Sequence, residues 1–218
     1  MDLQTERLAP QAYEQILDLI LSDKVRPTEH LNERKLAELI GVSCTPIRDA
    51  LLKLETEGLV VRNGRMGVQI KHMNIDEFLD ALEVRTLLEP TMSRKAAGKI
   101  SPRLLNELES LLQNALSQYD ASGSAIDRKD SRWIDDRLHG LISEASGNSQ
   151  LSLIINNLRR KTQIFDLKNI PERAIATCTE HLEIIDALRL SKGDKAADKM
   201  FIHLENVRDS IIERLAGS

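Results

Sequence analysis

Apolar residues recur at helical spacing over most of this chain. In the first such run the apolar side chains stand three and four positions apart, at positions 13, 16, 17, 20 and 21. They share one face of a helix that ends before Pro27. A second helix is predicted over residues 32–40 with Gly41 as its stop, and a third over residues 46–57, which Gly58 follows.

The pattern changes after Gly58 to two short apolar runs, at residues 59–62 and 68–71. Asn63-Gly64 between them is a turn signal typical of a β-hairpin. Three helices and a small hairpin are the elements of a winged helix-turn-helix domain, in which the second helix of the pair enters the major groove of DNA. We therefore predict such a domain over residues 1–72.

From residue 73 onward the pattern is helical almost throughout, with breaks at glycine, proline and capping residues. Six helices fit best, at residues 74–97, 102–119, 126–145, 149–165 and 171–190 and from 194 onward. Helices with short connections pack as an antiparallel bundle. The chain is therefore predicted to be mainly α, with an all-α six-helix second domain over residues 73–218.

Composition excludes several classes of protein. Hydrophobic residues make up 41% and charged residues 29%, which suits a folded chain, whereas only 3% are aromatic, which disfavours an all-β fold. No apolar stretch approaches the roughly 20 residues of a membrane span, and the first residues lack the apolar core of a secretory signal. We therefore expect a cytoplasmic protein with Cys44 and Cys178 as reduced thiols.

Charge is unevenly distributed along the chain. The net charge is −4, but residues 34–71 hold seven basic and four acidic side chains. This excess of positive charge lies in the predicted winged domain and favours DNA as its partner. The planar fork of Arg48 suits a base edge, and four further basic residues suit phosphates: Arg34, Lys53, Arg62 and Arg65.

Residues 31–60 read LNERKLAELIGVSCTPIRDALLKLETEGLV. This segment resembles the DNA-binding domain of GntR-type bacterial transcription regulators, whose pattern is close to LxExxLAxxLGVSRTPVREALxxLxxEGLV. The resemblance implies DNA contacts from Arg34, Thr45 and Arg48 and from the wing around Gly64 and Gly67. Cys44 stands where the family usually has arginine, and a thiol cannot make a bidentate charged contact, so operator preference should differ there.

Three histidines of the C-terminal segment fall on apolar helical faces: His139, His181 and His203. A histidine in such a place is usually a core residue with satisfied hydrogen bonds. Asp135 changes this interpretation, because an inward carboxylate is costly unless it is paired or binds a metal, and it stands four residues before His139. One oxygen and three nitrogen donors suit a divalent transition metal, with zinc favoured and manganese or nickel as alternatives.

Three segments around these residues, DDRLHGLISEASGN, EHLEIIDAL and FIHLENV, resemble the ligand segments of the FadR C-terminal ligand-binding (FCD) domain. Six helices indicate its VanR-like members. By that resemblance the metal ligands are Asp135, His139, His181 and His203.

In such domains the metal keeps open positions for the carboxylate of a small organic acid. Arg85, in EVRTLLEP, matches an arginine common in this domain and could hold a second anionic group of the acid. An ion pair with Glu89, four residues on, is the alternative role for Arg85. Arg159 and Arg160 are further candidates for binding the anionic effector.

The leading functional hypothesis is a metabolite-responsive transcription regulator without enzymatic activity. It is expected to act as a repressor that binds a palindromic operator in double-stranded DNA as a homodimer, with the bundle as effector and dimerisation domain. A metal-ion sensor is one alternative. A metal-dependent hydrolase is another, because three histidines and a carboxylate could activate water, but the basic winged domain would then have no role.

Overall fold

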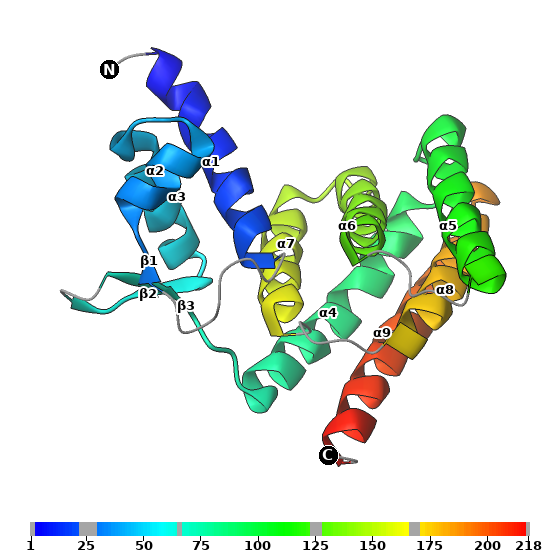
Figure 1. Ribbon diagram of the computed structural model, residues 1–218. Helices are drawn as coiled ribbons and strands as arrows, with labels where there is room; N and C mark the ends of the chain where they lie inside the picture. Colours follow the sequence, from blue (N-terminus) through cyan, green and yellow to red (C-terminus); the bar gives the residue numbers. More distant parts are fainter. Residues whose placement is uncertain (1–2, 22–29, 65–66, 123–127, 166–170, 217–218) are drawn as a thin grey trace. The chain divides into compact units, whose positions relative to one another are not determined.

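The computed structural model describes residues 3–21, 30–64, 67–122, 128–165 and 171–216. Within these ranges the chain forms nine helices and three short strands (Figure 1). They belong to two compact units. Unit 1 comprises residues 1–78 and 160–167, and unit 2 comprises residues 79–159 and 168–218.

Unit 1 contains helices α1 (Leu3–Leu21), α2 (Glu33–Ile40) and α3 (Cys44–Thr56). Asn32 caps α2, since its side-chain oxygen accepts hydrogen bonds from the backbone N–H groups of Arg34 and Lys35. Gly41 ends α2 in the left-handed conformation, with φ of +78°. The apolar faces of the three helices form one core, in which the largest fully buried side chains include Tyr13, Ile16, Ile47, Leu51 and Leu54.

The sheet of unit 1 has three antiparallel strands in the order β1-β3-β2. The predicted hairpin is formed by β2 (Val60–Arg62) and β3 (Val68–Ile70), with Val61 opposite Gln69. A strand that the sequence did not indicate, β1 (His30–Leu31), pairs with the other edge of β3. Two residues are too short to show the alternation that marks a strand. The predicted winged helix-turn-helix is confirmed.

Unit 2 is built from most of the six helices predicted downstream of the wing, whose ends are shifted by a few residues; residues 75–78 of α4 and 160–165 of α7 belong to unit 1. The six helices are α4 (Ile75–Ala96), α5 (Pro102–Ser122), α6 (Arg128–Ala145), α7 (Ser149–Phe165), α8 (Pro171–Arg189) and α9 (Gly193–Ala216). Leu82, Leu138, Ile184 and Leu204 are among its buried core residues. The mainly α fold is thus confirmed. Within the described ranges, no helix combines the length and apolarity needed to cross a membrane.

The last turns of α7 belong to unit 1 rather than to unit 2. Ile164 is buried in the same apolar core as Tyr13. Arg160 forms an ion pair with Glu57, with Nη1 and Oε2 3.4 Å apart, and its guanidinium lies 5.2 Å from the centre of the Tyr13 ring. The hydroxyl of Tyr13 donates to the same glutamate. These contacts make the end of α7 a structural part of the winged domain.

Candidate metal centre and DNA-binding face

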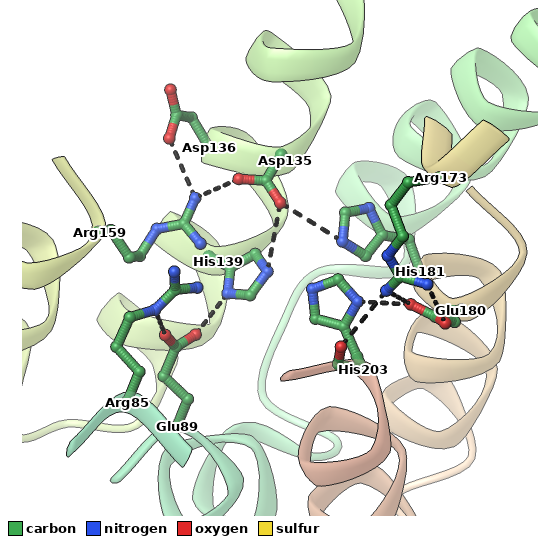
Figure 2. A network of polar contacts seen from close by, with 10 residues as sticks. All are labelled: Arg85, Glu89, Asp135, Asp136, His139, Arg159, Arg173, Glu180, His181 and His203. Carbon is green, nitrogen blue, oxygen red and sulfur yellow. Dashed lines mark hydrogen bonds and ion pairs between the residues drawn. The ribbon is translucent and has the colours of Figure 1, made fainter. Parts of the chain in front are cut away.

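Four predicted metal ligands meet in unit 2. Asp135 and His139 project from α6, His181 from α8 and His203 from α9, and one donor atom from each lies within 4.8 Å of the others. The centres of the three imidazole rings are 4.8 to 5.7 Å apart (Figure 2). Positions more than 60 residues apart in sequence, such as His139 and His203, are thus brought to one point by the packing of three helices.

The side chains are oriented toward a common centre. Oδ1 of Asp135 lies 3.5 Å from Nε2 of His139 and 3.5 Å from Nε2 of His181. Both nitrogens are buried and have no hydrogen-bond partner among the described residues. A buried polar atom without a partner is costly, which argues against two core histidines with satisfied hydrogen bonds. A metal ion would satisfy both nitrogens together.

The donor set fits a divalent transition metal. Nitrogen ligands bind zinc at about 2.0–2.1 Å, so two ligands of a tetrahedral ion stand about 3.4 Å apart. The four donors all lie within 4.8 Å of one another, so the widest pair would close by up to about 1.4 Å on binding one ion. Burial lowers the pKa values of His139 and His181, which keeps these imidazoles neutral and therefore in the form that binds metals.

His139 is held from its other side by α4. Its Nδ1 lies 2.5 Å from Oε2 of Glu89, and the other oxygen of Glu89 accepts from Nε of Arg85 at 2.6 Å. Burial works against the charged form of Glu89, but Arg85 and His139 outweigh it and lower the pKa of this carboxyl. The ion pair that the four-residue spacing predicted as the alternative role of Arg85 is therefore present.

His203 is held in a similar way by α8. Its Nδ1 lies 2.7 Å from Oε2 of Glu180, which also accepts from the guanidinium of Arg173. Nδ2 of Asn206 donates to the other oxygen of Glu180 at 2.7 Å. Burial would raise the pKa of Glu180, but these hydrogen bonds lower it to about 2, so the glutamate is ionised.

The two arginines of α7 that were predicted to bind the effector have different partners. Nη2 of Arg159 donates to Asp135 at 2.6 Å and to Asp136 at 3.0 Å, within unit 2. Burial disfavours the charged form of Asp135, but Arg159 outweighs it and holds the pKa of that carboxyl well below its usual range. The guanidinium of Arg160 is engaged with Glu57 and Tyr13 in unit 1.

Sequence reasoning missed Arg173 and Glu180 entirely, and it identified Glu89 only as a partner of Arg85. Glu180 directly precedes His181, yet it contacts His203 on another helix. Adjacent helical residues point in directions about 100° apart, so the position of Glu180 beside His181 in the sequence does not predict its contact with His203.

The predicted DNA-contacting residues of α3 share a face at its N-terminal end. Cys44, Thr45 and Arg48 stand at positions i, i+1 and i+4, where Thr45 and Arg48 are exposed and Cys44 is half-buried. Nε of Arg48 donates to Oε2 of Glu33 on α2 at 2.6 Å. Arg62 on β2 approaches the other oxygen of Glu33 at 3.9 Å. The two arginines are therefore gathered at one carboxylate.

The other predicted DNA contacts are more widely placed in unit 1. Arg34 is exposed on α2. Lys53, five positions after Arg48, lies on a different face of α3, with Nζ 4.2 Å from the centre of the Tyr13 ring. Gly64 and Gly67 adopt φ of +49° and +99° in the wing, values that favour glycine. Arg65 lies outside the described residues.

Two protein families match consecutive parts of the chain. Residues 8–70 match the family described as "Bacterial regulatory proteins, gntR family". Residues 80–206 match the family described as "FCD domain". The first match covers the winged helix-turn-helix and the second covers all four clustered donors.

Two curated relatives agree with these matches, and a solved structure shares the fold. The Nta operon transcriptional regulator of Aminobacter aminovorans is 26% identical over 200 residues, which cover 92% of this chain and 92% of that protein. The HTH-type transcriptional repressor RspR of Escherichia coli K12 is 26% identical over 215 residues, which cover 95% of this chain and 90% of that protein. The structure of E. coli McbR/YncC is similar with a TM-score of 0.78 at 18% identity, over 95% of this chain and 98% of that one, which shows the fold alone.

Proposed function

We propose that a metal-dependent site for a small organic acid controls the binding of this transcription regulator to a palindromic operator. The chain belongs to the GntR family of bacterial regulatory proteins and carries an FCD domain. A twofold-symmetric homodimer matches the two half-sites of such an operator. In this proposal the chain acts as a repressor; its relative RspR is named a transcriptional repressor.

One observation carries the metal site: the buried Nε2 atoms of His139 and His181 have no hydrogen-bond partner among the described residues and face the same oxygen of Asp135. With His203 these residues supply three nitrogen donors and one oxygen donor. Such a set suits zinc, and manganese or nickel are the alternatives. Four protein ligands would fill a tetrahedral zinc, so the carboxylate of an acid would bind an ion that takes five or six ligands.

The charges around the donors support an anionic effector. Three guanidinium groups and four carboxylates lie around the imidazoles (Figure 2). The guanidinium groups are those of Arg85, Arg159 and Arg173, and the carboxylates are those of Glu89, Asp135, Asp136 and Glu180. These seven charged side chains alone carry one negative charge, and a divalent ion would change it to one positive charge. A small acid is then attracted to the loaded site and repelled by the empty one. Arg159, beside Asp135, is the proposed partner of the acid.

The DNA-binding roles are proposed for the exposed face of α3 and its surroundings. Arg48 would contact a guanine edge, and Thr45 and Cys44 lie beside it on the same helical face. Arg34 would contact phosphate, and the wing at Gly64 and Gly67 would approach the DNA backbone. The ion pair between Arg48 and Glu33 is exposed, so phosphate or base contacts can replace it at low cost.

The experiment compares operator binding by zinc-loaded and chelator-treated protein, each with and without a panel of small carboxylic acids. The operator is first selected from random duplex DNA with the purified protein. We expect at least one acid to change the affinity of the zinc-loaded protein and to leave the chelator-treated protein unchanged. An acid that acts equally on both would contradict the metal-dependent site. A change caused by metal alone, with no response to any acid, would identify a metal-ion sensor instead.

A further inference from the structure

Two of the three clustered imidazoles are supported by the same arrangement. Nδ1 of His139 contacts Glu89, which is paired with Arg85, and Nδ1 of His203 contacts Glu180, which is paired with Arg173. Figure 2 shows both chains of contacts running from an arginine through a glutamate to an imidazole. These glutamates come from α4 and α8, whereas the imidazoles come from α6 and α9. Each support therefore joins two helices.

We propose that Glu89 and Glu180 are positioning residues, which fix His139 and His203 in the tautomer that presents Nε2 to the metal. This inference rests on the metal site of the proposed function. An ionised carboxylate only accepts hydrogen bonds, so Nδ1 of each histidine must carry the proton. In a neutral imidazole the lone pair is then on Nε2, and Nε2 is the atom left to bind the ion.

Glu180 is the more firmly fixed of the two supports. Its Oε1 accepts from Nη1 of Arg173 at 2.8 Å and from Asn206 at 2.7 Å, and its Oε2 accepts from His203 at 2.7 Å. Arg173 also reaches the backbone oxygen of His203, with Nη2 at 3.4 Å. Both oxygens of the carboxylate are thereby committed, so rotation of Glu180 would break contacts with α8 and α9 together. The imidazole of His203 is held in one orientation before any ion binds.

The first test measures the zinc affinity of a variant on α8 and of one on α4. Glu180→Gln keeps the size of the side chain but removes the charge, and its amide can donate to Nδ1 and so favour the wrong tautomer. We expect zinc binding, measured by competition with a chromophoric chelator, to weaken about 10- to 100-fold. Glu89→Gln should have an effect of the same size through His139.

Glu183→Gln is the matched control. Glu183 also lies on α8 and also pairs with α9, through Nζ of Lys199 at 2.6 Å, but its side chain is 49% exposed and it contacts none of the four donors. Zinc affinity of this variant should stay within about twofold of the unchanged protein, as expected for a surface ion pair. Equal zinc affinities for Glu180→Gln, Glu89→Gln and Glu183→Gln would overturn the inference.

The second test reads the tautomers directly in the metal-free, unsubstituted protein. Long-range proton–nitrogen correlation spectra distinguish an imidazole protonated at Nδ1 from one protonated at Nε2. We expect the Nδ1–H form for both His139 and His203. The Nε2–H form at either position would overturn the inference. Because this test uses the unsubstituted protein, it does not depend on the folding of any variant. A protein with these tautomers that binds no zinc would instead contradict the proposed function.

Discussion

Arg159 donates to Oδ2 of Asp135 at 2.6 Å, which leaves Oδ1 of that carboxylate facing the imidazoles of His139 and His181. The guanidinium thus orients one proposed metal ligand and places a positive charge beside it. Arg159 is itself buried, so its charge is only weakly screened by solvent. Arg159 therefore stands beside the proposed metal site as a cationic partner for the proposed anionic effector.

Arg159→Gln should weaken acid binding to the zinc-loaded protein by about tenfold or more, because a hydrogen bond to a charged group contributes about 1.5–3 kcal/mol. Titration calorimetry with an acid identified in the operator assay measures this change. At saturating zinc the metal content should remain at one ion per chain, since Asp135 and the three histidines are still present.

Arg160→Gln is the control for this substitution. The next residue along α7 is equally basic, but its guanidinium contacts Glu57 and Tyr13 in unit 1. Acid affinity should therefore be unchanged in Arg160→Gln. If the two variants lost acid affinity equally, a specific role of Arg159 would be excluded.

His181→Ala should abolish the stabilisation of the protein by zinc. A ligand at 1,000 times its dissociation constant stabilises the folded state by about 4 kcal/mol, so zinc should raise the unfolding temperature of the unsubstituted protein and a chelator should lower it. Thermal unfolding followed by circular dichroism measures both shifts. His72→Ala, which removes an exposed histidine of unit 1, should respond to zinc like the unsubstituted protein. A full zinc response in His181→Ala would show that the four donors are not the site.

Arg48→Ala and Arg34→Ala should weaken operator binding in different ways. Loss of a bidentate base contact from Arg48 should cost about 1–3 kcal/mol and relax the preference for one base. Loss of a phosphate contact from Arg34 should weaken binding to all sequences and reduce the salt slope by about 1. Gel-shift titrations at several salt concentrations separate the two effects. Unchanged operator affinity in Arg48→Ala would remove this residue from the base-contact role.

Ile164→Ala should destabilise the winged domain by about 2–5 kcal/mol, although residue 164 lies far along the chain from that domain. Hydrogen exchange of backbone amides in α1 and α3 measures this loss. Ile154→Ala removes a 46%-exposed side chain from the same helix and should change exchange in these helices little. Equal exchange in the two variants would contradict the placement of the end of α7 in the core of unit 1.

The helices were predictable because each carries its own local signals. Asn32 caps α2, Gly41 ends it, and Pro102 opens α5, all of which can be read from neighbouring residues. The assignment of the end of α7 to unit 1 was not predictable. The helix over residues 149–165 was predicted, but its pattern does not tell which core Ile164 joins.

The cluster of the four proposed ligands was predictable for a similar reason, and the residues that contact them were not. Asp135 and His139 stand four residues apart on one helix, and inward donors of this kind are unusual enough to be noticed in a sequence. Glu180 meets His203 only because α8 packs beside α9, which places residues 23 positions apart in contact. Salt bridges of this kind depend on tertiary structure and leave no local pattern. For the same reason the sequence could not distinguish Arg159, beside Asp135, from Arg160, beside Glu57.

The central claim is that Asp135, His139, His181 and His203 together hold one divalent metal ion. Anomalous X-ray diffraction from crystals of the protein purified without chelators, recorded on both sides of the zinc absorption edge, tests it most directly. We predict a single strong peak in the anomalous difference map, within bonding distance of Oδ1 of Asp135 and of the three imidazoles. A map without a peak there, after the crystals have been soaked in zinc, manganese and nickel in turn, would contradict it.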